Sequence, residues 1–155
     1  MINLNFRSAI DFEEFCCYWM TDIIKKGKGD RVRFVRYGSS GQAQSGVDII
    51  SSPIDKMPAV AQCKCYSRPF TLADLKSELE KTDNYPHPIK YYFLLTTANP
   101  HTSIQNAMPA GYLTHTRSDG TSFNVYIRYW SELEDINFCH NLHGSVIFPR
   151  YNLRQ

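Results

Sequence analysis

The chain opens with a stretch in which apolar side chains recur at helical spacing. The stripe consists of Phe12, Phe15, Trp19, Ile23 and Ile24. Apolar positions three and four residues apart share one face of an α-helix. Ser8 or Asp11 is a suitable N-cap, and Gly27 and Gly29 follow the last apolar position. The pattern therefore predicts a first helix over about residues 11–26.

Short alternating or apolar runs, typical of strands, fill the middle of the chain. They cover residues 31–37, 47–51 and 59–66, separated by a Gly-, Ser- and Gln-rich loop at 38–45 and a turn at 52–58. A second helix follows, because Thr71 and Asp74 have the spacing of a capping box and good helix formers continue to Thr82.

The remaining segments complete an α/β pattern. Residues 91–96 form a strongly apolar strand, residues 100–108 a short helix, residues 124–130 a further strand and residues 131–138 a short helix. The order α-β-β-β-α-β-α-β predicts an α/β fold with a central mixed β-sheet flanked by helices. The pattern predicts one domain over residues 1–142, and residues 143–155, which have no clear period, are expected to be a tail or the start of a linker.

Composition agrees with one globular domain and leaves the partner open. The chain has 155 residues, of which 43% are hydrophobic and 21% charged, and its formal net charge of +2 is too small to indicate nucleic-acid binding. One basic run is made up of Lys25, Lys26, Lys28, Arg31, Arg33 and Arg36. It could follow a phosphate backbone or be a solvated surface.

Hydropathy and cysteine usage indicate the compartment. No run of about 18 apolar residues predicts a membrane span, and acidic residues near the N-terminus interrupt any signal-peptide core. The five cysteines are an odd number, and Cys16–Cys17 and Cys63/Cys65 are too close in sequence for ordinary disulfides. A reducing, cytoplasmic location fits these features best.

Candidate chemistry lies on the strand at 59–66 and the strand before it. Alternation along a strand divides the side chains between two faces. One face takes Val60, Gln62, Lys64 and Tyr66, and the other takes Ala61, Cys63 and Cys65. Asp48 stands between Val47 and Ile49 and is expected to point away from their apolar face. We therefore expect Asp48, Gln62 and Lys64 to converge where two strands meet.

These three residue types suit phosphodiester hydrolysis with Mg²⁺ or Mn²⁺. Asp48 and the side-chain carbonyl of Gln62 offer the oxygen ligands that Mg²⁺ prefers, and the metal would polarise a phosphate oxygen and acidify a bound water. Lys64 could orient that water or stabilise the negative charge that develops on phosphorus. One anion holds a hydrated ion weakly, so Glu13 or Glu14 on the first helix is expected to add a carboxylate, with Glu13 preferred.

The motif resembles a known nuclease group. Asp48 within Gly-Val-Asp-Ile-Ile, followed by Gln62-Cys63-Lys64, resembles the PD-(D/E)xK nuclease superfamily in its Asp…Gln-x-Lys form. The loop Gly41–Gly46, with Gln42 and Gln44, is similar to the endonuclease effector domains at the N-terminus of bacterial anti-phage proteins, the Avs-type nucleases among them. The strand at 125–130 with the following Ser-Glu-Leu resembles their closing strand and helix, so the resemblance extends over about residues 12–142.

The resemblance implies a restriction-endonuclease-like fold and a metal-dependent endonuclease that cuts DNA, with double-stranded DNA expected, in anti-phage defence. Residue by residue, it makes Asp48 the main metal ligand, Gln62 the second ligand and Lys64 the catalytic lysine. Glu13 matches the helix carboxylate, which would also bind the metal, and Gln42 and Gln44 match loop residues that position substrate. Gln62 replaces the usual acidic residue and so removes a negative charge. Control by homo-oligomerisation, or by a sensor or ATPase domain beyond residues 143–155, is expected.

Plainer interpretations remain open. Asp48 could simply end a strand, and the loop glutamines could simply be solvated. A nuclease fold without catalysis could bind DNA or hold an oligomer together. A zinc site could join Cys63 and Cys65 to Cys139-His140-x-x-His143, but Cys-x-Cys within a buried strand is a poor zinc motif, and packing of these cysteines in the core is the favoured interpretation.

Overall fold

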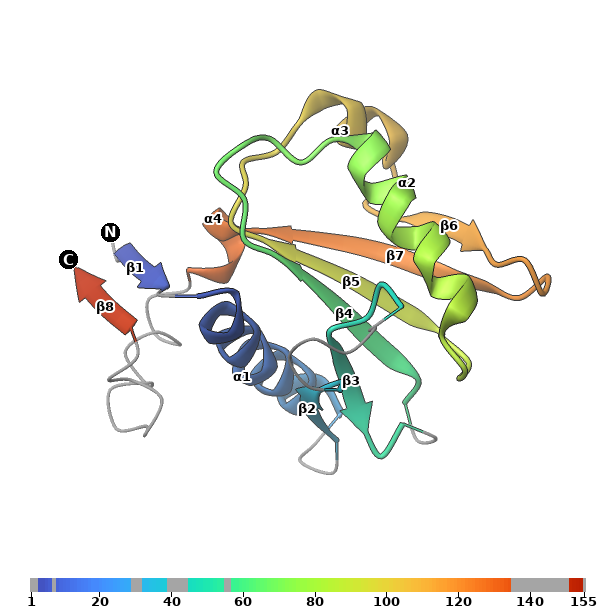
Figure 1. Ribbon diagram of the computed structural model, residues 1–155, viewed down its shortest axis with the longest axis horizontal. Helices are drawn as coiled ribbons and strands as arrows, with labels where there is room; N and C mark the ends of the chain where they lie inside the picture. The colour runs from blue at the N-terminus through green and yellow to red at the C-terminus, as the bar shows by residue number, and fades with distance from the viewer. Residues whose placement is uncertain are drawn as a thin grey trace.

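The computed structural model describes residues 3–6, 8–28, 32–38, 45–54, 57–134 and 151–154. Within these residues, the centre of the molecule is a six-stranded sheet in the order β2-β3-β4-β5-β7-β6 (Figure 1). Its strands are β2 (Arg33–Arg36), β3 (Ile49–Ser52), β4 (Ala59–Lys64), β5 (Tyr91–Thr96), β6 (Leu113–Thr116) and β7 (Ser122–Tyr129). A separate two-stranded sheet pairs β1 (Asn3–Phe6) with β8 (Tyr151–Arg154) in antiparallel register.

The large sheet is mixed. β2, β3 and β4 are antiparallel neighbours, β4, β5 and β7 run parallel, and β6 returns antiparallel to β7 as a hairpin. Parallel neighbours need a crossover connection. Between β4 and β5 the chain forms α2 (Leu72–Lys81) and the 3₁₀ turn η1 (Thr82–Asn84), and between β5 and β6 it forms α3 (Thr102–Ala107).

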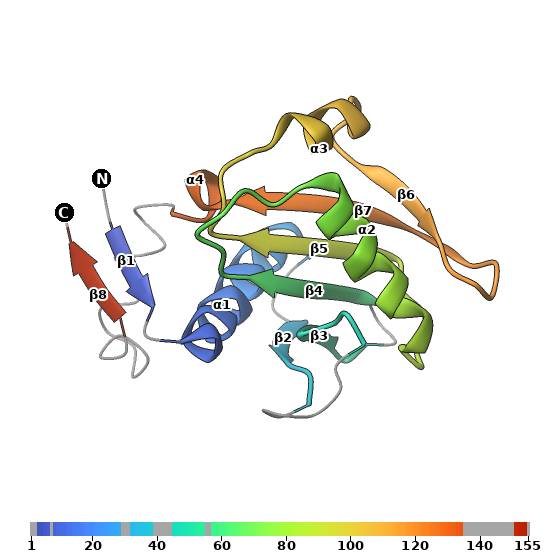
Figure 2. The ribbon, with the colours of Figure 1, turned by 45° about the horizontal axis from the view of Figure 1, so that its top comes forward.

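Helices cover both faces of the sheet, which gives two separate cores. The long helix α1 (Ala9–Lys28) lies on one face, and α2 with α3 lies on the other (Figures 1 and 2). The buried α1-side core contains Phe12, Phe15, Cys16, Trp19, Met20, Phe34, Ile49, Ala59, Ala61 and Leu95. The buried α2-side core contains Val47, Val60, Phe70, Leu75, Leu79, Tyr92, Leu94, Val125 and Ile127. Burial on both faces explains why β4 and β5 read as nearly continuous apolar runs.

The first helix follows its predicted stripe over most of its length. The hydroxyl of Ser8 accepts a hydrogen bond from the Asp11 backbone N–H at 3.2 Å, so Ser8 caps the helix. Phe12, Phe15 and Trp19 are buried as expected. The prediction was wrong for Ile23, which is 43% exposed. Beyond Met20 the helix meets β2 through Thr21 instead, whose hydroxyl accepts the Phe34 N–H at 3.0 Å.

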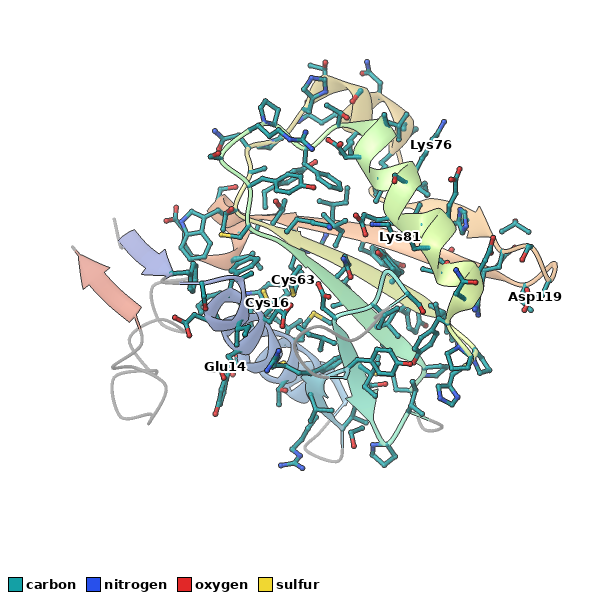
Figure 3. All side chains as sticks on the ribbon, in the orientation of Figure 1. Glu14, Cys16, Cys63, Lys76, Lys81 and Asp119 are labelled. Atoms are coloured by element: carbon teal, nitrogen blue, oxygen red, sulfur yellow. The ribbon has the colours of Figure 1, made fainter. Side chains whose placement is uncertain are left out.

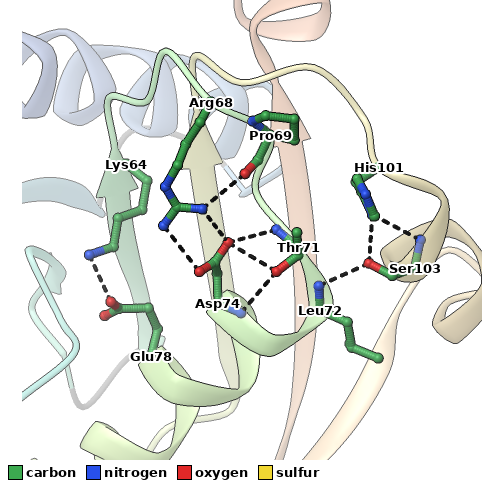
Figure 4. Close-up of polar contacts among 9 residues, drawn as sticks. All are labelled: Lys64, Arg68, Pro69, Thr71, Leu72, Asp74, Glu78, His101 and Ser103. Carbon is green, nitrogen blue, oxygen red and sulfur yellow. Dashed lines mark hydrogen bonds and ion pairs between the residues drawn. The ribbon is translucent and has the colours of Figure 1, made fainter.

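The second helix begins with the predicted capping box, which is confirmed. The Thr71 hydroxyl accepts the Asp74 N–H at 3.4 Å, and the Asp74 carboxylate accepts the Thr71 N–H at 2.9 Å (Figure 4). Arg68 pairs with the same carboxylate at 2.9 Å. These contacts hold the pKa of Asp74 well below its usual range, the hydrogen bonds from Arg68 first and those from Thr71 next.

A buried arginine fastens the other end of α2 to the β6–β7 hairpin. The Arg117 guanidinium donates to the carbonyl oxygens of Thr82 at 2.6 Å and His87 at 3.0 Å, and also to that of Tyr85. These carbonyls belong to η1 and to the turn that leads into β5. Arg117 therefore links the β6–β7 hairpin to the backbone of η1 and of the turn before β5.

The predicted α/β class, a central mixed sheet flanked by helices, is confirmed. Strands β1, β6 and β8 were not predicted. Of the last predicted helix, residues 131–138, the structure shows α4 (Trp130–Leu133), which ends at the C-cap Glu134, and residues 135–138 fall outside the described residues. So does most of the predicted tail at 143–155, except for the four residues of β8. Among the described residues, no helix is both long and apolar enough to cross a bilayer.

Candidate active site

The two faces of β4 carry the side chains that alternation predicted, and this prediction is confirmed for the strand. Ala59, Ala61 and Cys63 pack with α1, whereas Val60 packs with α2. Gln62 and Lys64 therefore share the α2 side. Gln62 is 7% exposed, and the Lys64 side chain is 18% exposed, so both polar groups stand in a largely dry layer between sheet and helix.

Asp48 reaches this region in a different way from the one predicted. Val47 packs in the α2-side core and Ile49 in the α1-side core, so they share no face from which Asp48 could point away. The alternation failed because β3 begins only at Ile49. Asp48 lies just before it, and its backbone N–H donates to the Ala61 carbonyl at 2.9 Å.

The Asp48 carboxylate then accepts a hydrogen bond from a backbone N–H of β4 for which β3 offers no carbonyl. Its Oδ2 accepts the Cys63 N–H at 2.9 Å, a donor on β4 beyond the last residue that pairs with β3. The two strands separate at this point. Gln62 lies in the chain between Ala61 and Cys63, the two residues that Asp48 contacts, so the carboxylate is held beside the Gln62–Lys64 segment.

Burial makes the Asp48 carboxyl a weaker acid than an exposed aspartic acid. It raises the pKa of the carboxyl from 3.8 to about 6, against the hydrogen bond from Cys63 and the charge of Lys64, which lower it. The negative charges of Glu13 and Glu78 raise it further. Asp48 is thus a buried carboxylate with an incompletely compensated negative charge, the kind of group that gains from a nearby cation.

Glu78 of α2 is part of the cluster, and the sequence pattern did not single it out. Its carboxylate is buried and faces β4: Oε1 lies 2.7 Å from Lys64 Nζ (Figure 4), and Oε2 accepts the Gln62 Nε2 at 3.2 Å. Lys81, one turn along the helix, reaches the same Oε1 at 3.0 Å. A signal was present, because Glu78 falls at helical spacing between the buried Leu75 and Leu79.

Gln62 makes one side-chain hydrogen bond and leaves one polar atom without a partner. Its Nε2 donates to Glu78, while its Oε1 is buried and has no hydrogen-bond partner. Buried carbonyl oxygens in proteins are nearly always paired, so an orphan is a specific observation. Together with Asp48 it offers two hard oxygen atoms, which fits the donor preference of Mg²⁺.

Of the two helix carboxylates considered, Glu13 is the one whose charge raises the pKa of Asp48. Its Oε2 accepts the Arg36 Nε at 3.0 Å across to β2. Burial is the main cause of the raised pKa of the Cys17 thiol, and the negative charges of both Glu13 and Glu14 add to it. Arg36, from the basic run, is therefore an ion-pair partner at this site, and Arg33 is exposed on the same strand.

The loop that precedes Asp48 is anchored at Gly46. Gly46 has φ +72°, and a Cβ there would stand 2.7 Å from the Glu78 carbonyl oxygen and 3.1 Å from the Lys81 Cβ. Its own carbonyl accepts the Tyr92 hydroxyl at 3.0 Å. The chain therefore passes directly against α2 before entering the site. Gln42 and Gln44 lie outside the described residues.

The cysteines do not add ligands to this site. The Cys16 and Cys63 thiols are in hydrogen-bonding contact in the α1-side core (Figure 3), and burial raises the pKa of both. The expectation of core packing is correct for Cys63 and wrong for Cys65, which is exposed because β4 ends one residue earlier. In the part of the chain that is described, no three His, Cys, Asp or Glu side chains converge as a metal-ligand set. Cys139, His140 and His143 lie outside that part.

The arrangement brings together a buried carboxylate, an unpartnered amide carbonyl and an ammonium group whose charge acts on the carboxylate. They come from the approach to β3, from β4 and, through Glu78 and Glu13, from two helices on opposite faces of the sheet. No protein-family model, no curated protein and no solved structure matches this chain.

Proposed function

We propose that this chain is a metal-dependent DNA endonuclease of the restriction-endonuclease-like, PD-(D/E)xK class, which hydrolyses phosphodiester bonds. One observation carries the proposal. At the point where β3 and β4 separate, the buried Asp48 carboxylate, the unpartnered Gln62 carbonyl and the Lys64 ammonium group lie within one polar cluster. The mixed sheet with helices on both faces is compatible with this class.

The residues present fit a divalent cation. Asp48 and Gln62 Oε1 would hold Mg²⁺ or Mn²⁺, and Glu13 would strengthen the site through its negative charge. When bound, the ion supplies Lewis-acid polarisation of a phosphate oxygen. The raised pKa of Asp48 supports this assignment, because a carboxylate that is costly to ionise alone is stabilised by a cation.

The protein's own groups supply the other parts of the reaction. Lys64 lies at the end of β4, where its ammonium group can donate a hydrogen bond to a phosphate oxygen and offset the charge that develops there. Burial excludes most water from the cluster, which strengthens that interaction. Arg36 and Lys81 add positive charge next to Glu13 and Glu78, and a DNA backbone would pass over this region.

The resemblance of the Asp…Gln-x-Lys motif to anti-phage effector nucleases supports double-stranded DNA as substrate and defence as the biological role. It also supports restraint by homo-oligomerisation or by a sensor domain. These partners are part of the proposal because a free nuclease of this kind would endanger the DNA of its own host.

One observation favours a second candidate, a nuclease fold that binds DNA without cutting it. Glu78 already pairs with Lys64 at 2.7 Å, and a lysine engaged in this way does not face a phosphate until the pair opens. Such a module would bind plasmid DNA with or without Mg²⁺ and leave it intact.

The test is cleavage of supercoiled plasmid with Mg²⁺ or with EDTA, using the wild type and the variants Asp48→Ala and Lys64→Ala. Cleavage by the wild type in Mg²⁺, lost in both variants while their thermal melts stay cooperative, is the expected result. Lys90→Ala is the matched control, because Lys90 precedes β5 at the end of the sheet opposite to Lys64. Full cleavage by purified Asp48→Ala protein would refute the mechanism. Ion-independent binding without cleavage would favour the second candidate.

A further inference from the structure

The hydrogen bond between Glu78 and Gln62 allows only one orientation of the Gln62 side-chain amide. A carboxylate accepts hydrogen bonds and donates none, so it can bind only the NH₂ end of an amide. Gln62 Nε2 lies 3.2 Å from Glu78 Oε2, and the carbonyl Oε1 is left buried and unpartnered. Without Glu78, nothing among these contacts distinguishes the two ends of the amide.

We infer that Glu78 is a positioning residue that turns the Gln62 amide so that its carbonyl oxygen, rather than its NH₂ group, is offered to a divalent cation. The inference rests on the proposed function, since it concerns the same cation site. An amide in the opposite orientation would present N–H donors to the ion and repel it. Glu78 thus makes a neutral amide usable at a position where most of the superfamily has an acidic residue.

The other contacts of Glu78 suit a positioning group rather than a ligand. Its Oε1 is shared by Lys64 at 2.7 Å and Lys81 at 3.0 Å, and its Oε2 is taken by Gln62. Both oxygens are therefore engaged by donors of this chain. The carboxylate is also carried by the helix α2, whose Leu75 and Leu79 pack in the α2-side core and whose Glu78 carbonyl lies close to Gly46.

The direct readout is the dissociation constant for Mg²⁺, measured by isothermal titration calorimetry on the full chain. Outer-shell partners of metal ligands typically contribute 10- to 100-fold in affinity, so Glu78→Gln should weaken Mg²⁺ binding about tenfold or more. Raising the Mg²⁺ concentration should restore plasmid cleavage by this variant. Glu80→Gln is the matched control, because it is the same substitution at an exposed position of the same helix and should leave the affinity unchanged.

A double variant separates orientation from general support of the fold. In Gln62→Glu/Glu78→Gln the two groups exchange places and keep one hydrogen bond between them. A carboxylate has two equivalent oxygens and needs no orienting, so the double variant should recover Mg²⁺ affinity relative to Glu78→Gln. A purely structural role for Glu78 predicts no such recovery.

The outcomes distinguish this inference from the proposed function. Mg²⁺ binding by Glu78→Gln within twofold of the wild type, with binding lost in Asp48→Ala, overturns the inference alone. A folded double variant as weak as Glu78→Gln also overturns it. If Glu78→Gln gives no cooperative melt, the double variant decides: folded protein that binds Mg²⁺ supports the inference, and folded protein that does not bind overturns it. A wild type that neither binds Mg²⁺ nor cuts DNA overturns the proposed function, and the inference with it.

Discussion

Replacing Asp48 by asparagine should make the folded chain more stable at neutral and alkaline pH. The pKa of this carboxyl is 3.8 in its ordinary environment and about 6 in the folded chain, with burial as the main cause. Each tenfold change in acidity corresponds to about 1.4 kcal/mol, so ionised Asp48 lowers the free energy of unfolding by about 3 kcal/mol. The asparagine side chain would keep a carbonyl oxygen to accept the Cys63 N–H and would carry no charge.

The sign of the pH dependence follows from proton binding. Between pH 4 and pH 6 the folded wild type binds more protons at Asp48 than the unfolded chain does, so its stability falls as pH rises through that window. The stability associated with a neutral Asp48 is fully present below pH 3.8 and is lost above about pH 6. The advantage of Asp48→Asn should therefore be about 2–3 kcal/mol at pH 8 and about one third of that at pH 4.5.

Thermal unfolding followed by circular dichroism in EDTA measures this difference. For a chain of this size, 2–3 kcal/mol corresponds to a rise in melting temperature of about 5–10 °C at pH 8. Asp119→Asn, at an exposed position of the β6–β7 hairpin (Figure 3), is the control of opposite sign, because hydrogen bonds from Thr121 lower the pKa of the Asp119 carboxylate. An Asp48→Asn variant that melts at or below the wild type at pH 8, or whose advantage is independent of pH, would refute the reasoning.

Two further predictions concern residues that hold the loops and helix ends around the sheet in place, and both are tested by urea denaturation. Gly46→Ala should lower the free energy of unfolding by about 2–4 kcal/mol, because it combines a left-handed backbone with a Cβ 2.7 Å from the Glu78 carbonyl oxygen. Gly120→Ala, with φ +88° and no atom within 4 Å, should lower it by about 1 kcal/mol. Equal losses in the two variants would contradict the close approach of Gly46 to α2. Arg117→Met should lower the free energy of unfolding by about 3 kcal/mol, because the carbonyls of Thr82, Tyr85 and His87 lose the hydrogen bonds that the Arg117 guanidinium donates to them. Arg68→Met, at an exposed position, should lower the free energy of unfolding far less. A larger loss in Arg68→Met than in Arg117→Met would contradict this reasoning.

Much of the fold follows from local sequence. Hydrophobic spacing located α1, which buries one face at helical period, and short apolar runs located β4 and β5. The capping box at Thr71 was found because its hydrogen bonds join residues three positions apart. Strand β6 was missed, since three of its four residues are polar, none of them is fully buried, and it is held in place by pairing with β7.

In the candidate site, too, some positions follow from local sequence and others depend on contacts between distant elements. Gln62 and Lys64 share a side of β4 because strand alternation is a local property of the chain. Asp48 does not follow alternation, because its position depends on where β3 separates from β4, and that is a relation between two strands. Its raised pKa comes from burial by elements distant in sequence, so it too could not be read locally.

The sequence by itself determined the residue types and the spacing on which the proposed metal-assisted hydrolysis rests: Asp48, then Gln62 and Lys64 on one strand. The tertiary structure decided which carboxylates surround them. It brings Glu78 from α2 onto both Gln62 and Lys64, and it pairs Glu13 with Arg36. The physical reason is that hydrogen bonds and ion pairs act over a few ångströms in space, and packing helices against a sheet sets those distances independently of separation along the chain.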